Sequence, residues 1–163
     1  MRIEYLADHP ELVPELAVLH YGQWGYLRPA QTLEERTQRL RDACGRGGVP
    51  SVVVALDADG ALCGSAMLIA SDMDARPELT PWLAGVYVVE GFRGRGYGSA
   101  LVARVESEAA AIGAERLYLY TPSAADFYGH LGWTVDERCE CLGQEVTVMS
   151  RQIAADPERE ESY

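Results

Sequence analysis

The segment Arg93-Gly94-Arg95-Gly96-Tyr97-Gly98-Ser99 constrains the fold of this chain more than any other feature of its sequence. It separates an apolar run at 83–89 from an amphipathic helical pattern at 98–112, so it predicts a strand, a tight turn and a helix. Glycines let such a turn approach a ligand without a Cβ in the way, and free N–H groups at the start of a helix attract anions. A tight turn that merely needs glycine is the alternative. The joint occurrence of strand, arginines, glycines and helix favours an anion-binding turn, with phosphate as the natural ligand.

The sequence excludes two familiar phosphate-binding motifs. A Rossmann dinucleotide site needs a third glycine where this chain has Ser99, and its acidic residue would be Glu115, at the start of the next predicted strand rather than its end. A P-loop needs Gly-Lys followed by Ser or Thr, and the chain contains no lysine. The turn therefore predicts a different phosphate ligand.

The net charge of the chain limits the classes of binding partner that we expect. The chain has 163 residues, 25 of them acidic and 14 basic, which gives a formal net charge of −11. A nucleic-acid-binding protein or a protein that docks on anionic lipid needs a basic face, so we expect neither partner. The same balance suits a cationic small substrate, although most of these charges belong to an ordinary solvated surface.

Other sequence signals predict a single cytoplasmic domain without a metal. No apolar run has the length of a membrane span, and the first residues lack the pattern of a signal peptide. The four cysteines have neither a disulfide framework nor zinc-ligand spacing, so we predict reduced thiols and no metal site. We expect one domain over residues 1–153 and a disordered acidic tail over 154–163.

Hydrophobic periodicity and turn signals predict an α+β fold in the order β-α-α-β-β-β-α-β-α-β-β. The sheet is expected to be mixed, with helices on both faces. An aromatic loop is predicted at 21–29, and a capping box opens the second helix at Thr32. The predicted strands are 2–6, 51–56, 61–70, 83–89, 115–120, 133–139 and 145–153, and the predicted helices begin near Pro10 or cover 32–45, 98–112 and 123–131.

Two motifs resemble those of the GCN5-related N-acetyltransferase (GNAT) superfamily. Arg93, Gly96 and Gly98 are similar to its R-x-x-G-x-G signature, and residues 124–133 (AADFYGHLGW) resemble its late motif A-x-x-x-Tyr-x-x-x-Gly-aromatic. The element order is also similar over nearly all of residues 1–153. The resemblance implies a mostly antiparallel sheet that is split between its fourth and fifth strands, at 83–89 and 115–120, with acetyl-CoA bound in the split.

The resemblance also implies where acetyl-CoA is held. The pantetheine arm would pair with the backbone of the fourth strand, as an added strand would. The amides of the glycine-rich turn would hold the pyrophosphate. Thr121 stands where many members carry an asparagine that touches the cofactor, and its hydroxyl replaces that group only in part. The implied cofactor-binding residues are Val86, Tyr87, Val88, Arg93, Gly94, Arg95, Gly96, Tyr97, Gly98, Ser99 and Thr121.

Tyr128 matches the family tyrosine near the CoA sulfur, where a phenol can protonate the departing thiolate. The alternative role for Tyr128 is a core aromatic beside Phe127. Many members use a glutamate near the start of the fourth strand to deprotonate the amine, but this chain has Trp82 there. Of the nearby acids Asp72, Asp74 and Glu78, we expect Glu78 to be the base, because it is closest to the strand; water and the other two acids remain alternatives.

The predicted acceptor wall combines aromatic rings and carboxylates, which suits an organic cation. Its predicted members are Trp24, Tyr26, Asp72, Asp74 and Trp82, although the two tryptophans would equally pack the edge of the core and the acids would equally be plain loop carboxylates. His9, His20 and His130 show no partner pattern, so surface or capping roles are expected for them.

These features predict an enzyme that transfers acetyl from acetyl-CoA to a primary amine by direct attack, without an acyl-enzyme. The acceptor is a small amine or a peptide N-terminus. A regulatory module that binds acyl-CoA without turnover is the alternative, and a homodimer is left open.

Overall fold

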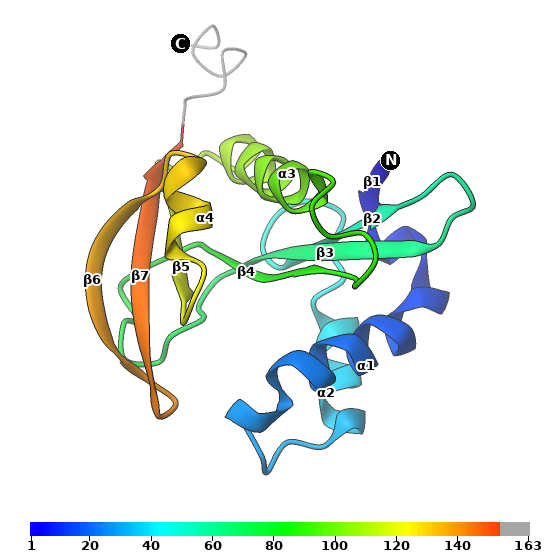
Figure 1. The fold of residues 1–163 in the computed structure, drawn as a ribbon, viewed down its shortest axis with the longest axis horizontal. Coiled ribbons are helices and arrows are strands. Elements are labelled where there is room, and N and C mark those ends of the chain that lie inside the picture. Colours follow the sequence, from blue (N-terminus) through cyan, green and yellow to red (C-terminus); the bar gives the residue numbers. More distant parts are fainter. Residues whose placement is uncertain (154–163) are drawn as a thin grey trace, which may run out of the picture.

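The computed structural model describes residues 1–153, and the predicted tail at 154–163 lies outside this range (Figure 1). The predicted order of helices and strands is confirmed. The elements are β1 (Arg2–Tyr5), α1 (Val13–Trp24), α2 (Leu33–Asp42), β2 (Ser51–Leu56), β3 (Leu62–Ile69), β4 (Trp82–Val88), α3 (Tyr97–Ala111), β5 (Arg116–Thr121), α4 (Ala125–His130), β6 (Thr134–Cys141) and β7 (Gln144–Gln152), with 3-10 turns at Leu6–Asp8, Pro10–Leu12 and Gly25–Leu27.

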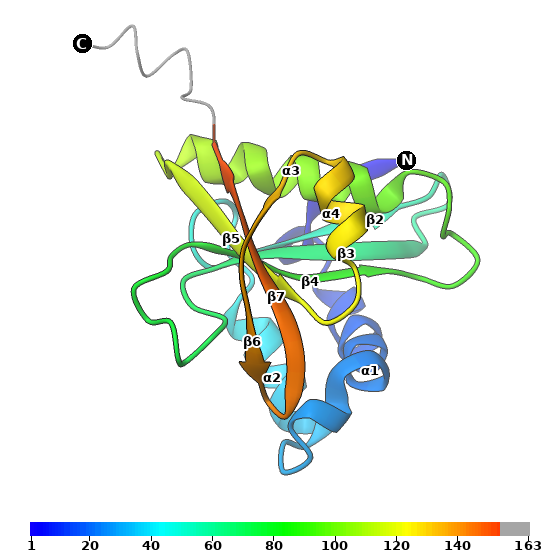
Figure 2. The same ribbon diagram turned by 60° about the vertical axis from the view of Figure 1, so that its left-hand side comes forward.

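The seven strands form one sheet in the order β1-β2-β3-β4-β5-β7-β6, and every neighbouring pair is antiparallel except β4 and β5. The parallel pair is joined only at its start, where Trp82 stands opposite Tyr118 and the Tyr118 amide donates to the Pro81 carbonyl at 3.1 Å. Figure 2 shows β5 and β7 turned steeply away from β3 and β4. The predicted split between the fourth and fifth strands is therefore confirmed.

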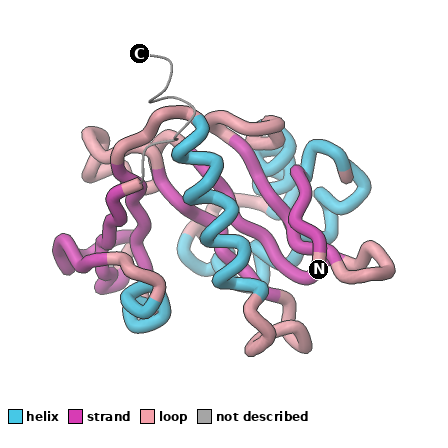
Figure 3. The backbone as a smooth tube through the Cα atoms, turned by 90° about the horizontal axis from the view of Figure 1, so that it is seen from above, coloured by secondary structure: helices cyan, strands magenta, loops and turns pink. Residues whose placement is uncertain are grey.

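Helices cover both faces of the sheet, which confirms the predicted fold class. Helix α3 runs across one face (Figure 3), and α1 and α2 lie on the other (Figure 1). Strand β2 is buried on both faces, because Val53 packs into the core beneath α3 while Val52 and Val54 pack against the core of α1 and α2. This double burial explains why the sequence of β2 is a continuous apolar run rather than an alternating one.

The aromatic segment at 21–29 differs from the prediction. Helix α1 continues to Trp24 and a 3-10 turn follows it, where the sequence predicted a loop. The Trp24 ring packs edge-on against the His20 ring one turn earlier, with 5.1 Å between centroids, and this i,i+4 contact favours the additional turn. By contrast, the predicted cap of α2 is confirmed, because Thr32 Oγ1 accepts from the Glu35 amide at 3.1 Å.

One further property of the described residues concerns membranes. None of the helices in residues 1–153 is long and apolar enough to cross a bilayer.

Candidate functional site

The glycine-rich turn leads directly into α3. Gly96 is the N-cap of this helix with φ +84°, and Gly94 has φ +76°, a left-handed region that favours glycine. No side chain caps α3, so the first amides of a 15-residue helix have no intrahelical acceptor. A Cβ built on Gly96 meets no atom within 4 Å, so the space in front of these amides is open. The turn therefore has the free N–H groups, the positive helix end and the room that a phosphate needs.

The arginines of the turn are folded back onto their own segment. Arg93 Nε donates to the Val88 carbonyl at 3.0 Å, and its guanidinium lies 5.8 Å from the centre of the Tyr87 ring. The Arg95 guanidinium lies over the Phe92 ring at 5.7 Å. These contacts tie the end of β4 to the turn while leaving both arginines exposed.

Gly98 has a packing role in addition to its place in the motif. A Cβ at this position would stand 3.3 Å from the Phe127 ring and 3.6 Å from a Val88 methyl. The missing side chain therefore lets α3 approach both β4 and α4, which brings the two motifs recognised in the sequence together in space.

Strand β4 carries a bulge at Gly85, which sequence reasoning missed. Gly85 has φ +58°, and the register between β3 and β4 shifts between Ser65 and Met67. The Gly85 carbonyl accepts from Ser65 Oγ at 2.8 Å, which fixes the bulge. A glycine inside a strand pattern is the signal that could have predicted it. Beyond the bulge, the edge of β4 that faces β5 has no strand partner, because the two strands have already diverged.

A cavity of about 750 Å³ opens at the split. Its walls come from α1, α2, the segment after β3, β4, β5, α4 and the β6–β7 hairpin, so elements from both faces of the sheet line it. The predicted site residues that line it are Trp24, Tyr26, Asp72, Val86, Thr121 and Tyr128. The predicted residues outside its lining are Asp74, Glu78, Trp82, Tyr87, Val88 and the turn Arg93–Ser99.

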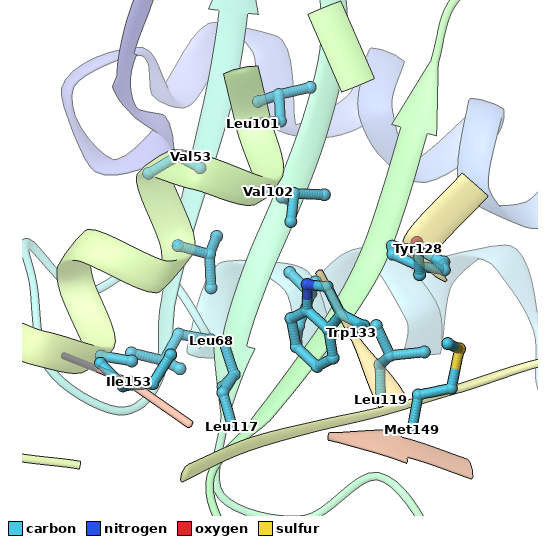
Figure 4. Close-up of a cluster of buried hydrophobic side chains, with 14 of the residues drawn as sticks. Val53, Leu68, Leu101, Val102, Leu117, Leu119, Tyr128, Trp133, Met149 and Ile153 are labelled. Atoms are coloured by element: carbon cyan, nitrogen blue, oxygen red, sulfur yellow. The ribbon is translucent and has the colours of Figure 1, made fainter. Parts of the chain in front are cut away.

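Tyr128 lies both in the core and in the cavity wall, and its catalytic role stays a prediction. Its ring lies at one edge of the core beneath α3 (Figure 4), with ring centroids 6.1 Å from Trp133 and 5.0 Å from Phe127. It also lines the cavity, and its hydroxyl makes no hydrogen bond to another described residue. Burial raises the pKa of Tyr128 to about 12, so the phenol is protonated at every physiological pH.

Thr121 has a local partner for its side chain. Its Oγ1 accepts from the amides of Ser123 and Ala124 at 3.3 and 2.9 Å, just before α4 begins. The hydroxyl oxygen is therefore occupied in shaping the turn that positions Tyr128, and only its O–H remains to donate into the cavity.

The structure separates the three candidate acids. Asp72 lines the cavity, and burial raises its pKa to about 7 although the nearby Arg28 and Arg39 act in the opposite direction. Asp74 and Glu78 are exposed and lie outside the lining. The expectation that Glu78 serves as the base thus receives no support from its position, and Asp72 is the acid that the cavity includes.

Trp82 does not lie in the acceptor wall, where the sequence analysis placed it. The side chain has no exposed surface and packs with Met73, Val146 and Val148. Its indole N–H donates to the Leu79 carbonyl at 2.6 Å. Trp82 is therefore a core residue at the vertex of the split, because the first residues of β4 are the ones that still pair with β5.

His20 is a buried residue of the cavity wall, where the sequence predicted a surface or capping role. Its Nε2 lies 2.9 Å from Ser65 Oγ, and because that hydroxyl donates to the Gly85 carbonyl, the histidine N–H is the donor. Burial lowers the pKa of His20 to about 4, so the ring is neutral. His20 thus supports the β4 bulge from helix α1. Only tertiary contacts reveal this role.

The fold and this site define an acyltransferase, and the comparisons with known proteins identify the family. The model described as "Acetyltransferase (GNAT) family" matches residues 13–133, which are 121 of the 163 residues. The chain therefore belongs to the GNAT acetyltransferase family. No curated protein matches the sequence significantly.

Solved structures of this family share the fold at low identity. An aminoglycoside 6'-N-acetyltransferase complexed with coenzyme A has a TM-score of 0.74 and 18% identity over 96% of this chain and 99% of its own. The aminoglycoside 6'-N-acetyltransferase from Enterococcus faecium has a TM-score of 0.72 and 19% identity over 96% and 99%. A phosphinothricin acetyltransferase from Sinorhizobium meliloti, in complex with AcCoA, has a TM-score of 0.61 and 22% identity over 76% and 70%.

Proposed function

We propose that this protein transfers the acetyl group of acetyl-CoA to a primary amine by direct attack. The observation that carries the proposal is a single cavity that joins the open edge of β4, the Tyr128 phenol and the Asp72 carboxyl. Such a cavity lets a donor and an acceptor approach one another through the split from opposite faces of the sheet.

The donor site is made mainly of backbone. The amides of Arg93–Ser99 bind the pyrophosphate, and the open space at Gly96 supports this role. The pantetheine arm pairs with β4 along Val86, Tyr87 and Val88, as an added strand does. One backbone N–H of this edge donates to the thioester oxygen and stabilises the charge that develops there.

The chemistry needs a base and an acid. The neutral amine nitrogen attacks the thioester carbon, so a C–N bond forms and the C–S bond breaks. The Asp72 carboxylate takes the amine proton, directly or through a water molecule. Its pKa of about 7 suits this task at neutral pH. The Tyr128 phenol, which carries its proton at neutral pH, protonates the CoA thiolate as the C–S bond breaks.

An assay of thiol release tests the proposal. Purified protein is incubated with acetyl-CoA and a panel of small amines and peptides, and free CoA thiol and acetylated products are measured by colorimetry and mass spectrometry. We expect one CoA thiol for each acetylated amine. Binding of acetyl-CoA with no turnover on any amine would instead support the regulatory module, and acetylation of peptides alone would identify a peptide N-terminus as the acceptor.

A further inference from the structure

Three arginines line the acceptor side of the cavity. Arg28 follows the 3-10 turn after α1, and Arg36 and Arg39 lie three residues apart on α2, so they share one side of that helix. The lining contains one carboxylate, Asp72, and it lies near enough to Arg28 and Arg39 for both to lower its pKa. A protein with a net charge of −11 thus has three guanidinium groups against a single acid in this cavity.

None of these three arginines makes a direct ion pair or a side-chain hydrogen bond within residues 1–153, although Arg28 and Arg39 interact with Asp72 at longer range. Arg28 and Arg39 are exposed, and Arg36 is half-buried. Arg76 and Arg104 pair with Glu137 and Glu108 at 2.7 and 2.9 Å, but no comparable ion pair or side-chain hydrogen bond reaches the arginines of the cavity. Arg36 Nε is buried without any hydrogen-bond partner. A buried donor of this kind is costly unless a ligand meets it.

Their position separates them from the donor phosphates. Leu40, next to Arg39 on α2, packs into the core that α1 and α2 form on one face of the sheet. The anion-binding turn begins α3, which lies on the opposite face (Figure 1). The pyrophosphate therefore has its own site, and the arginines are left for the acceptor.

We propose that the acceptor carries a carboxylate in addition to its amine, and that Arg28, Arg36 and Arg39 bind this carboxylate. The inference rests on the proposed function and names its substrate class, a zwitterion of amino-acid size. Guanidinium groups recognise carboxylates through paired, charge-assisted hydrogen bonds. In this proposal Asp72 binds the amino group, and the arginines bind the carboxylate. The organic cation expected from the sequence therefore describes only the amino group of the acceptor.

Matched substrates test the proposal. The 20 standard amino acids and the α-amide of each are compared as acceptors, so that each pair differs mainly in the carboxylate. We expect at least one acid to exceed its amide by tenfold or more in kcat/KM, because a charge-assisted hydrogen bond is lost. This preference would be the reverse of that expected from amine ionisation alone. The amine of the amide is less basic, so a larger fraction of it is neutral and able to attack at pH 7. Amides that equal or exceed their acids throughout, or a preference for an aminoglycoside, would overturn the proposal.

Variants connect the preference to the arginines. Arg39→Gln and Arg36→Gln are expected to raise KM for the preferred acid by tenfold or more and to leave KM for its amide within about twofold. Arg41→Gln is the matched control, because Arg41 is exposed on the same helix and lies outside the cavity lining. Equal effects of the three variants on acid and amide would overturn the assignment.

A binding measurement distinguishes failure of this proposal from failure of the proposed function. If no amine is acetylated, the proposed function fails, and the carboxylate site is then decided by titrating the same acids and amides into the CoA complex by calorimetry. Tighter binding of acids, lost in Arg39→Gln and kept in Arg41→Gln, supports the site. Equal binding of acids and amides, or none, overturns it.

Discussion

The two halves of the cavity are built from different materials. The proposed donor half is formed by backbone at the Gly85 bulge and the unpaired edge of β4, and the turn at Gly96 lies beyond the cavity lining. The acceptor half consists of side chains from segments far apart in the sequence, such as Arg36 on α2, Asp72 after β3 and Gln144 in the last hairpin. A site made of backbone leaves a trace in the local sequence, because only glycine tolerates its angles. A site made of side chains leaves none, because any surface arginine looks the same until the chain has folded.

Tyr128 stands where the halves meet, and its substitution gives the largest expected effect. Tyr128→Phe keeps the ring packing and removes the proton donor, so kcat should fall by about 10²–10⁴-fold while affinity for acetyl-CoA changes little. Steady-state kinetics and calorimetry measure the two quantities. Tyr21→Phe is the control, since Tyr21 is exposed and outside the cavity lining. A loss below about threefold in a folded protein would mean that another group protonates the thiolate.

His20 lines the acceptor side of the cavity and is linked through Ser65 to the Gly85 bulge of the donor side. Its titration should make the free energy of unfolding depend on pH. The folded pKa of about 4 lies below the usual 6.5, so the unfolded chain binds more protons between these values. The stability contribution is complete above pH 6.5 and is lost as pH falls toward 4, by about 3 kcal/mol. Urea unfolding at pH 7 and pH 4 measures this loss. In His20→Gln the pH dependence of stability should be weaker by about that amount, and an unchanged dependence would show that folding does not shift the pKa of His20.

Gly96→Val perturbs the donor half alone. The new side chain would fill the space in front of the α3 amides, so the Kd for acetyl-CoA should rise by about 100-fold, the worth of one or two charge-assisted hydrogen bonds. Calorimetry measures it. Gly48→Val is the matched control, because Gly48 also has positive φ and open surroundings, so the same backbone strain is introduced, but it precedes β2 rather than α3. Unchanged affinity in folded Gly96→Val would remove the turn from the phosphate site.

Asp72→Asn perturbs the acceptor half alone, and kcat/KM should fall by about 10²-fold, the lower end of the range for general base catalysis, because water remains as an alternative base. In the unmodified protein the rate should rise through pH 7, where the carboxyl ionises, and the variant should lack this rise. Because the folded pKa is raised, Asp72 costs stability as pH rises toward 7, so Asp72→Asn should melt at a higher temperature at pH 8. Asp74→Asn is the control. A pH profile that survives in Asp72→Asn would assign the base elsewhere.

Local patterns in the sequence were sufficient to predict most of the fold, whereas the donor site was inferred from the family resemblance and stays a prediction. The glycine-rich turn, the Thr32 cap and the continuous apolar run of β2 each depend on neighbours within one or two turns of chain. The errors have tertiary causes. Trp82 was assigned to the acceptor wall because nothing local indicates that β4 and β5 meet at that residue, and His20 looked unpartnered because Ser65 lies 45 residues away. The arginines of the cavity were missed for the same reason, since their shared feature is the cavity itself.

The single point of attachment between β4 and β5 places the Trp82 indole at the closed end of the split. Its ring lies 5.9 and 6.2 Å, centroid to centroid, from Tyr118 and Tyr120 of β5, and the seven residues of β4 extend from it as an arm of about 20 Å. Strand β4 is also held by β3 along its whole length, so the split opens on one edge of β4 only. A Trp82 substitution would therefore alter packing at the closed end of the split without changing any residue of the cavity lining.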